Sequence, residues 1–224
     1  MRLQLKKIFL LTQIFIFLAC NSKIDQKITI SKIEGSPSFE SSKLSLTEQV
    51  KVDDEYQFSF DVVEYELGVK TETEFNYQLA NSNKGQHIHF IVNNEPYSAH
   101  YVNNFKKTVD DDDIILAFLS RSHHESVKNK DAYVFTQIND GTSDLSKEFL
   151  FYSRPKGTYT GKDSEKVLLD FYLLNTEIST NGNKVRATIN NTIFLIEDWA
   201  PYYIEGLEEG ETVSYTHLRA HETG

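Results

Sequence analysis

The residues that most suggest chemistry are histidines between positions 87 and 124. His87 and His89 lie two residues apart in QHIHFIV, a segment that we expect to form a strand. Because alternate residues of a strand share a face, both imidazoles could bind one metal ion. Neutral imidazoles are typical ligands of Zn²⁺ and Cu²⁺. The alternative is a hydrogen-bonded surface pair. The candidate metal ligands are His87, His89, His100 in the following hairpin arm, and His123 and His124 beside Glu125.

Ser120, Arg121 and Ser122 begin a second candidate site, the segment SRSHHES at residues 120–126. This segment resembles the Ser-x-x-His stretch of forkhead-associated domains, in which the Ser and a neighbouring Arg hold a phosphothreonine. The turn at 139–141 lies roughly where that family has its Asn-Gly turn, whereas the family's upstream Gly-Arg pair is missing. The resemblance implies phosphopeptide binding, with Arg121 forking to phosphate oxygens. The alternative is a loop capped by its own Ser and His hydrogen bonds.

Aromatic and basic side chains supply the remaining candidates for ligand binding. Trp199, Tyr202 and Tyr203 follow an expected strand, where they could stack on a sugar or peptide or pack into the core. Arg154 belongs to the basic turn RPKG of an acidic protein, where it could receive an anion or face solvent. The aromatic candidates in the arm that carries His100 are Tyr97 and Tyr101.

Motifs of catalysis are missing from the sequence. We find no nucleophile elbow, phosphate-binding glycine loop, dinucleotide fingerprint or HExxH pair. Ser, His and Asp residues are present, but no local frame marks a catalytic triad. The favoured interpretation is therefore a binding protein rather than an enzyme, with no cofactor beyond a Zn²⁺ or Cu²⁺ ion at the histidines.

The elements that must position these residues are expected to be strands. The chain has 224 residues with 39% hydrophobic and 25% charged residues, which excludes collagen-like, coiled-coil and low-complexity classes. Segments rich in Val, Ile, Phe, Tyr and Thr recur at short intervals, and no segment of ten residues has a clear helical period. We expect an all-β fold with strands near residues 27–33, 57–67, 86–92, 114–119, 132–138, 149–152, 166–174, 184–189 and 192–196.

A weak internal repeat suggests two similar halves. The segment HIHFIVNN at residues 87–94 is followed by Pro-Tyr and an acidic run, and VRATINNT at 185–192 is followed by Pro-Tyr-Tyr and another acidic run. Short strands separated by turn signals are typical of β-sandwiches. We therefore predict tandem immunoglobulin-like sandwiches at residues 28–147 and 148–213, the second of them incomplete.

The first residues read as an export signal. Residues 1–19 combine a basic start with a short apolar stretch, as in secretory signal peptides. The segment FLAC that ends at Cys20 resembles the lipobox of bacterial lipoproteins, with Phe17 in place of the usual aliphatic residue. The resemblance implies that Cys20, the single cysteine, is acylated and anchors the protein to a membrane through the tether 20–27.

The last residues of the chain do not continue the pattern of short strands and turns that precedes them. The segment SYTHLRAHETG at residues 214–224 resembles translated sequencing-adapter read-through, which implies that this tail is artefactual and that the native protein differs beyond about Val213. The net charge is −10, and removing the three basic residues of the signal takes it to −13, because Arg219 and Glu222 cancel in the tail. Such acidity disfavours nucleic acid as a partner.

Four stretches extend the resemblance over most of the chain: GQHIHFIVNNEPYSAHY, AFLSRSHHES, LFYSRPKGTY and DWAPYYIEGL. They are similar to a group of lipoproteins from Flavobacterium-type bacteria (Bacteroidota), whose members are sometimes labelled phosphopeptide-binding proteins. The resemblance implies a lipid-anchored protein of the cell envelope, on the periplasmic or the surface face of the outer membrane. We expect it to bind an envelope protein, peptide or glycan, with metal binding and phosphopeptide binding as alternatives.

Overall fold

The computed structural model describes residues 27–73, 78–139, 141–210, 212 and 214–219. The predicted signal, Cys20 and all but the last residue of the tether lie outside these residues. The described residues form fourteen strands and one short 3-10 helix and contain no α-helix, so the predicted all-β class is confirmed. No helix in this part of the chain is long and apolar enough to cross a membrane.

The strands are numbered in their order along the chain. They are β1 Thr29–Lys32, β2 Lys43–Val52, β3 Glu55–Val63, β4 His87–Val92, β5 Ser98–His100, β6 Asn104–Lys107, β7 Ile114–Ser120, β8 Tyr133–Gln137, β9 Phe149–Arg154, β10 Val167–Leu174, β11 Lys184–Ile189, β12 Thr192–Ile196, β13 Tyr202–Glu205 and β14 Ser214–Arg219. The 3-10 helix spans Gly161–Ser164.

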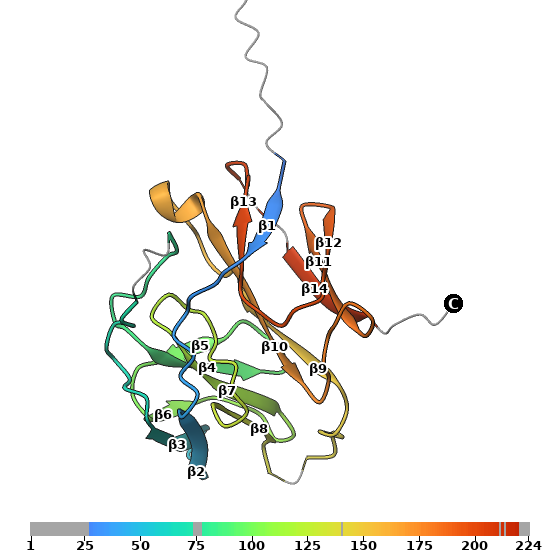
Figure 1. Ribbon diagram of the computed structural model, residues 1–224. Coiled ribbons are helices and arrows are strands. Elements are labelled where there is room, and N and C mark those ends of the chain that lie inside the picture. The colour runs from blue at the N-terminus through green and yellow to red at the C-terminus, as the bar shows by residue number, and fades with distance from the viewer. Residues whose placement is uncertain (1–26, 74–77, 140, 211, 213, 220–224) are drawn as a thin grey trace, which may run out of the picture.

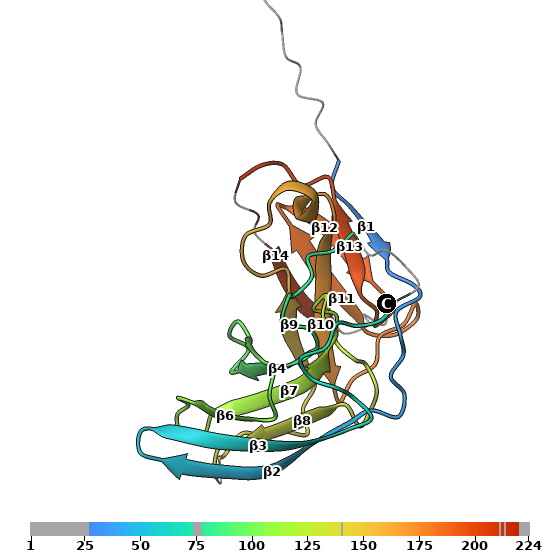
Figure 2. The ribbon, with the colours of Figure 1, turned by 90° about the vertical axis from the view of Figure 1, so that its left-hand side faces the viewer.

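The strands form four antiparallel sheets. Their orders are β2-β3-β6, β5-β4-β7-β8, β1-β13-β10-β9 and β12-β11-β14. The first two sheets lie in one half of the molecule and the last two in the other, as Figure 1 shows. Figure 2 shows the same two halves from the side, with β9 and β10 running toward β4 and β7.

Three apolar clusters hold these sheets together as successive layers. Phe58 of β3 and Phe90 of β4 belong to the core of the first half. Phe171 of β10 and Ala187 of β11 belong to the core of the second half. A third cluster joins the two halves across β7, β9 and β10, and its buried members are Ile91, Tyr97, Leu116, Phe118, Phe151, Tyr172 and Leu174.

This layering explains which strands are apolar throughout. β7, predicted from IILAFL to be buried on both faces, contributes Ala117 to the first core and Phe118 to the cluster between the halves. All eight residues of β10 are buried, because successive side chains face opposite sides: Phe171 enters the core of the second half and Tyr172 the cluster between the halves. A strand covered on both faces lacks the alternation of a half-exposed strand.

The first described strand belongs to the second half. β1 pairs with β13 in the register Thr29 with Glu205 and Lys32 with Tyr202. The sequence assigned residues 28–147 to one sandwich, whereas the structure divides this range between the two halves. The boundary near residue 147 does separate β8 from β9. An immunoglobulin-like topology stays a prediction.

Candidate metal site

β4 brings His87 and His89 to one buried face. The strand lies between β5 and β7, so both of its edges are paired. Ile88 and Phe90 enter the core of the first half. Because side chains alternate along a strand, His87 and His89 point to the opposite face, where both are 0% exposed.

The loop after β7 delivers a third imidazole, His124. The backbone N–H of His124 donates to Arg121 O at 2.9 Å, and the N–H of Arg121 donates to Glu125 O at 2.9 Å. His124 has a φ of +69°, in the left-handed region that is uncommon for residues other than glycine. This tight turn directs its ring onto that of His87, with 4.9 Å between the ring centroids.

The ring nitrogens of the three residues converge. Nε2 of His87 lies 2.9 Å from Nε2 of His89 and 3.2 Å from Nδ1 of His124. The three potential ligand atoms all lie within 4.8 Å of one another. Zn–N bonds of 2.0 to 2.1 Å in a tetrahedral site place two nitrogens about 3.3 Å apart. We define His87, His89 and His124 as the histidine cluster; its two separations from Nε2 of His87 are close to the spacing of two ligands on one ion.

The other ring nitrogens of the two strand residues are engaged with the protein. Nδ1 of His87 donates to Gly85 O at 2.8 Å, which leaves the Nε2 lone pair facing the cluster. Nδ1 of His89 lies 3.2 Å from Ser153 Oγ of β9. Imidazoles that bind metals usually make such a second hydrogen bond, which fixes the ring and its tautomer.

Gly85 has to be a glycine for this arrangement. Its φ is +88°, and a Cβ atom there would lie 2.4 Å from Val69 O. Gln86, the next residue, donates its backbone N–H to the same Val69 carbonyl at 2.6 Å. The tight packing at residue 85 thus sets the position of the carbonyl that receives the His87 hydrogen bond.

Burial keeps the cluster neutral. Burial, countered in part by the hydrogen bond to Gly85 and assisted by the charge of Arg154, lowers the pKa of His87 to about 4. Burial and the charge of Arg154 lower the pKa of His124 to about 2. The pKa of His89 is lowered well below its usual value by burial and by its two histidine neighbours. At neutral pH the imidazoles therefore carry lone pairs, the form that binds metals.

Aromatic and cationic side chains wall the cluster. The Tyr97 ring stacks on His89 with centroids 3.6 Å apart and planes 13° from parallel. Tyr101 lies 5.0 Å from His87 between ring centroids. Above Tyr97 lie the Lys156 ammonium, 4.2 Å from the ring centroid, and the Arg154 guanidinium, at 5.2 Å.

Two of the five predicted ligands lie elsewhere. His100 pairs with Ile88 across the β4–β5 ladder and so shares its face, where it stacks on Phe105 with 3.4 Å between centroids. His123 turns away from His124 and bonds Glu125 through Nε2 at 3.1 Å. Neither residue belongs to the group of potential ligands that the described residues bring together.

The predicted phosphopeptide loop is buried. Arg121 is 3% exposed, and its guanidinium donates to Ser126 O at 2.8 Å and to Pro37 O. It also forms an ion pair of 3.0 Å with Glu125. Ser120 and Ser122 are 0% exposed. These contacts favour the alternative of a loop capped by its own hydrogen bonds, and they count against capture of an external phosphate by Arg121.

The remaining ligand-binding candidates are divided between the core and the surroundings of the cluster. Trp199 donates Nε1–H to Phe171 O at 3.0 Å and packs on Tyr172 at an angle of 85°. Tyr202 belongs to the core of the second half, and Tyr203 packs beside the small cluster around Ile33. Tyr97, Tyr101 and Arg154 border the histidine cluster, as described above.

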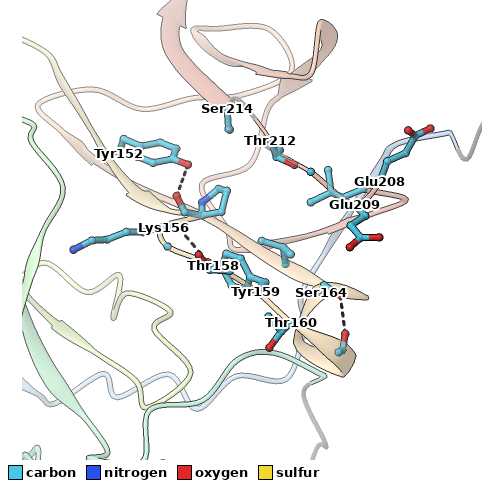
Figure 3. A pocket seen from close by; sticks show the side chains of 16 residues that line it. Tyr152, Lys156, Thr158, Tyr159, Thr160, Ser164, Glu208, Glu209, Thr212 and Ser214 are labelled. Atoms are coloured by element: carbon cyan, nitrogen blue, oxygen red, sulfur yellow. Dashed lines mark hydrogen bonds between the residues drawn. The ribbon is translucent and has the colours of Figure 1, made fainter.

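A separate cavity of about 820 Å³ lies between the β9–β10 segment and the residues that follow β13. Figure 3 shows tyrosine rings, hydroxyls and the carboxylates of Glu208 and Glu209 around it. Lys156 contributes to its wall, but its ammonium points away and donates to Tyr97 O. Lining residues from the β9–β10 segment include Tyr152, Thr158, Tyr159, Thr160 and Ser164.

The partners that orient the cluster carried no recognisable sequence signal. Ser153 and Gly85 lie in segments that the sequence singled out, but nothing in those segments marks them as partners of a histidine, and only the folded structure brings Ser153 to a residue 64 positions away. The sequence did suggest three residues that border the cluster, since Tyr97, Tyr101 and Arg154 were ligand-binding candidates.

Comparison with known proteins adds no family to these observations. A scan of the chain against protein-family models gives no match, and a search of curated proteins gives none. The function must therefore be argued from the site itself.

Proposed function

We propose that this chain is a β-sandwich metal-binding protein that takes up one Zn²⁺ or Cu²⁺ ion through His87, His89 and His124. The observation that carries the proposal is the convergence of three ring nitrogens, with separations of 2.9 and 3.2 Å around Nε2 of His87. Ligands of one tetrahedral ion have about this spacing.

The protonation states support the same interpretation. The lowered pKa values of the cluster mean that an arriving ion displaces few protons at pH 7. Gly85 O and Ser153 Oγ supply the second hydrogen bonds that metal-bound imidazoles usually have. Three histidines are the protein ligand set of some zinc sites that keep a fourth position for another donor.

The test is calorimetric titration of Zn²⁺ and Cu²⁺ into the full chain after removal of metal with a chelator. We expect binding of one ion per chain. The His89→Ala variant should lower the affinity at least a hundredfold, whereas His100→Gln, a matched change on the same hairpin, should leave it unchanged. Failure of the folded chain to bind either ion would contradict the proposal, and thermal melting verifies that each variant is folded.

We also propose that the protein is a lipid-anchored protein of the bacterial cell envelope. The support is the signal-like segment 1–19 and the lipobox-like FLAC at Cys20. Mass spectrometry of the protein from bacterial membranes should find an acylated N-terminal cysteine. In Cys20→Ser the acyl mass should be lost and the protein should leave the membrane fraction. An unmodified Cys20 in the membrane fraction would contradict this proposal.

A second candidate function is capture of an envelope peptide or glycan in the separate cavity. Its size of about 820 Å³ and its mixture of tyrosines, hydroxyls and carboxylates suit a polar organic ligand. A short basic peptide is the probe that Glu208 and Glu209 favour, because both carboxylates are exposed. The double change Glu208→Gln and Glu209→Gln should weaken its binding. Absence of peptide binding, together with binding of a neutral oligosaccharide, would favour a glycan instead.

A further inference from the structure

Among the described residues, the histidine cluster brings together no anion that would balance a bound ion. Three neutral imidazoles leave both charges of a divalent cation in place, and burying an uncompensated charge is costly. Arg154 and Lys156 add positive charge beside the cluster, since both lie over the ring of Tyr97, which stacks on His89. Within the described residues, the group of potential ligands contains no Cys, Asp or Glu.

The nearest buried carboxylates are already committed to other cations. Glu125 accepts from Arg121 and His123 at 3.0 and 3.1 Å. Asp170 accepts from Ser126 and forms an ion pair with Lys128. Neither can turn to the cluster without leaving a buried positive group unpaired, so the charge must be balanced by another donor.

Tyr97 is placed to supply that donor. Its hydroxyl lies 3.5 Å from Nδ1 of His124, close to the spacing of two ligands on one ion. Its ring is held between the His89 ring, 3.6 Å away between centroids, and the Lys156 ammonium at 4.2 Å. Tyr97 is 5% exposed, so its hydroxyl lies in the same buried region as the imidazoles.

We propose that Tyr97 is the fourth ligand of the metal, as a phenolate. This inference rests on the proposed metal-binding function. When the ion binds, the O–H bond of Tyr97 breaks, the proton passes to solvent, and an oxygen lone pair forms the bond to the metal, whose oxidation state does not change. The resulting three-nitrogen, one-oxygen donor set is of the kind that suits Cu²⁺.

The two cations beside Tyr97 fit this role. Lys156 Nζ lies over the ring and also donates to Tyr97 O, and the Arg154 guanidinium lies 5.2 Å from the ring centroid. Positive charge near a phenol stabilises its anion.

Tyr101 provides a matched control. Its ring also borders the cluster, 5.0 Å from His87, but its hydroxyl is bonded to Ser82 Oγ at 2.8 Å. Both tyrosines can be changed to phenylalanine with loss of one oxygen and no change of ring. A structural role of the ring alone would therefore be preserved in either variant.

The experiment is Cu²⁺ titration of the metal-free full chain followed by absorption spectroscopy, with Tyr97→Phe and Tyr101→Phe in parallel. Phenolate bound to Cu²⁺ gives a ligand-to-metal charge-transfer band that imidazoles do not give. We expect this band in the native protein and in Tyr101→Phe. In Tyr97→Phe we expect no band and a Cu²⁺ affinity lower by about tenfold or more.

The outcomes separate this inference from the proposed function. If the native protein binds one Cu²⁺ without the band, or if the band persists in Tyr97→Phe, the phenolate ligand is wrong while metal binding by the histidines stands. If the folded native protein binds no Cu²⁺ and no Zn²⁺, the proposed function fails and this inference fails with it.

Discussion

His123 and His124 are neighbours in the sequence and lie in opposite kinds of surroundings. His123 bonds the carboxylate of Glu125, which also pairs with Arg121. His124 meets two other imidazoles and no carboxylate. We name the first group, His123, Arg121 and Glu125, the Glu125 network. Both groups are buried, so burial alone does not determine what a histidine does.

The difference between the two groups lies in how charge is balanced. Burial raises the pKa of Glu125, but the hydrogen bond from His123 and the charge of Arg121 outweigh it and lower the pKa to about 2. Glu125 is therefore ionised, and its charge is balanced by Arg121 inside the network. The imidazoles of the histidine cluster are instead neutral, and their lone pairs are free to bind an ion. In this protein the better candidate for a ligand is therefore His124, whose ring nitrogen faces other imidazoles, rather than His123, which bonds a carboxylate already paired with Arg121.

The largest expected effect is a loss of folding stability of the metal-free protein at acid pH, caused by the histidine cluster. An unfolded histidine binds a proton near pH 6.5, whereas His87 does so only near pH 4. The unfolded state binds more protons between these values, so stability falls as the pH drops from 6.5 to 4. His87 alone accounts for a loss on the order of 3 kcal/mol, and His89 and His124 act in the same direction.

Urea unfolding in the presence of a chelator, at pH values from 7 to 4.5, measures this loss. His100, whose pKa burial also lowers to about 4, contributes in the same window. The comparison is therefore made in a His100→Gln background with and without His87→Gln. An unchanged slope of stability against pH after His87→Gln would contradict the prediction. The Glu125 contribution is lost at lower pH, as the pH falls from 4.5 toward 2.

The next effect is removal of the charge at the centre of the Glu125 network. Glu125→Gln leaves Arg121 buried without its carboxylate, and breaking a buried pair in this way costs about 3 to 5 kcal/mol. Urea unfolding at pH 7 measures the change. Glu205→Gln is the control, because its pair with Lys166 is partly exposed and should contribute about 1 kcal/mol or less. Equal losses of unfolding free energy in Glu125→Gln and Glu205→Gln would show that the buried pair contributes no more than the partly exposed one.

A smaller effect is expected from the partner of His89. Ser153→Ala removes the hydroxyl that lies 3.2 Å from Nδ1 of His89, and loss of such a partner typically lowers metal affinity about 10- to 100-fold. Calorimetric titration measures the affinity. Ser98→Ala is the control, since Ser98 Oγ bonds His100 at 2.9 Å, outside the cluster. Similar affinities in the two variants would argue against a role for Ser153 in orienting the ligand.

The smallest effect on stability is expected for His124→Asn, although this variant should have a large effect on metal binding. Asparagine tolerates the left-handed backbone of residue 124 better than most residues, so His124→Asn should change the free energy of unfolding by about 1 kcal/mol or less. The same variant should lose most of its metal affinity. His123→Asn should show the reverse, with lower stability and a folded cluster that still binds metal. If both variants lost stability and metal affinity to the same extent, the proposed difference in role between His123 and His124 would be wrong.

The sequence was sufficient for part of the candidate site. The period of two in HIH put His87 and His89 on one face, as the structure confirms. It could not exclude His100, because the face of that side chain depends on register. A shift of one residue would exchange the faces of β5, and the observed pairing with Ile88 sends His100 to the other side. The turn that selects His124 over His123 depends on contacts with residues 36 and 37, far away in the sequence.

The fold was predictable to a similar degree. Apolar segments such as 114–119 and 166–174 were found because burial on both faces leaves an uninterrupted apolar pattern. β2 was missed, since the polar run at residues 47–49 interrupts the alternation of KLSLTEQVKV at the point where the register shifts between Leu46 and Glu48. The segment 214–219, predicted from its sequence to be part of an artefactual tail, pairs with β11 along its length. Strand pairing is satisfied by backbone atoms, which a sequence pattern does not report.

The pairing of β1 with β13 has a consequence for folding. Thr29 and its partner Glu205 lie at opposite ends of the described residues, so most of the strands lie between them in the sequence. Contacts of such long sequence separation form slowly and leave strand edges open during folding. In any folding intermediate without β1, the edge of β13 that β1 covers is therefore open to pairing with another strand.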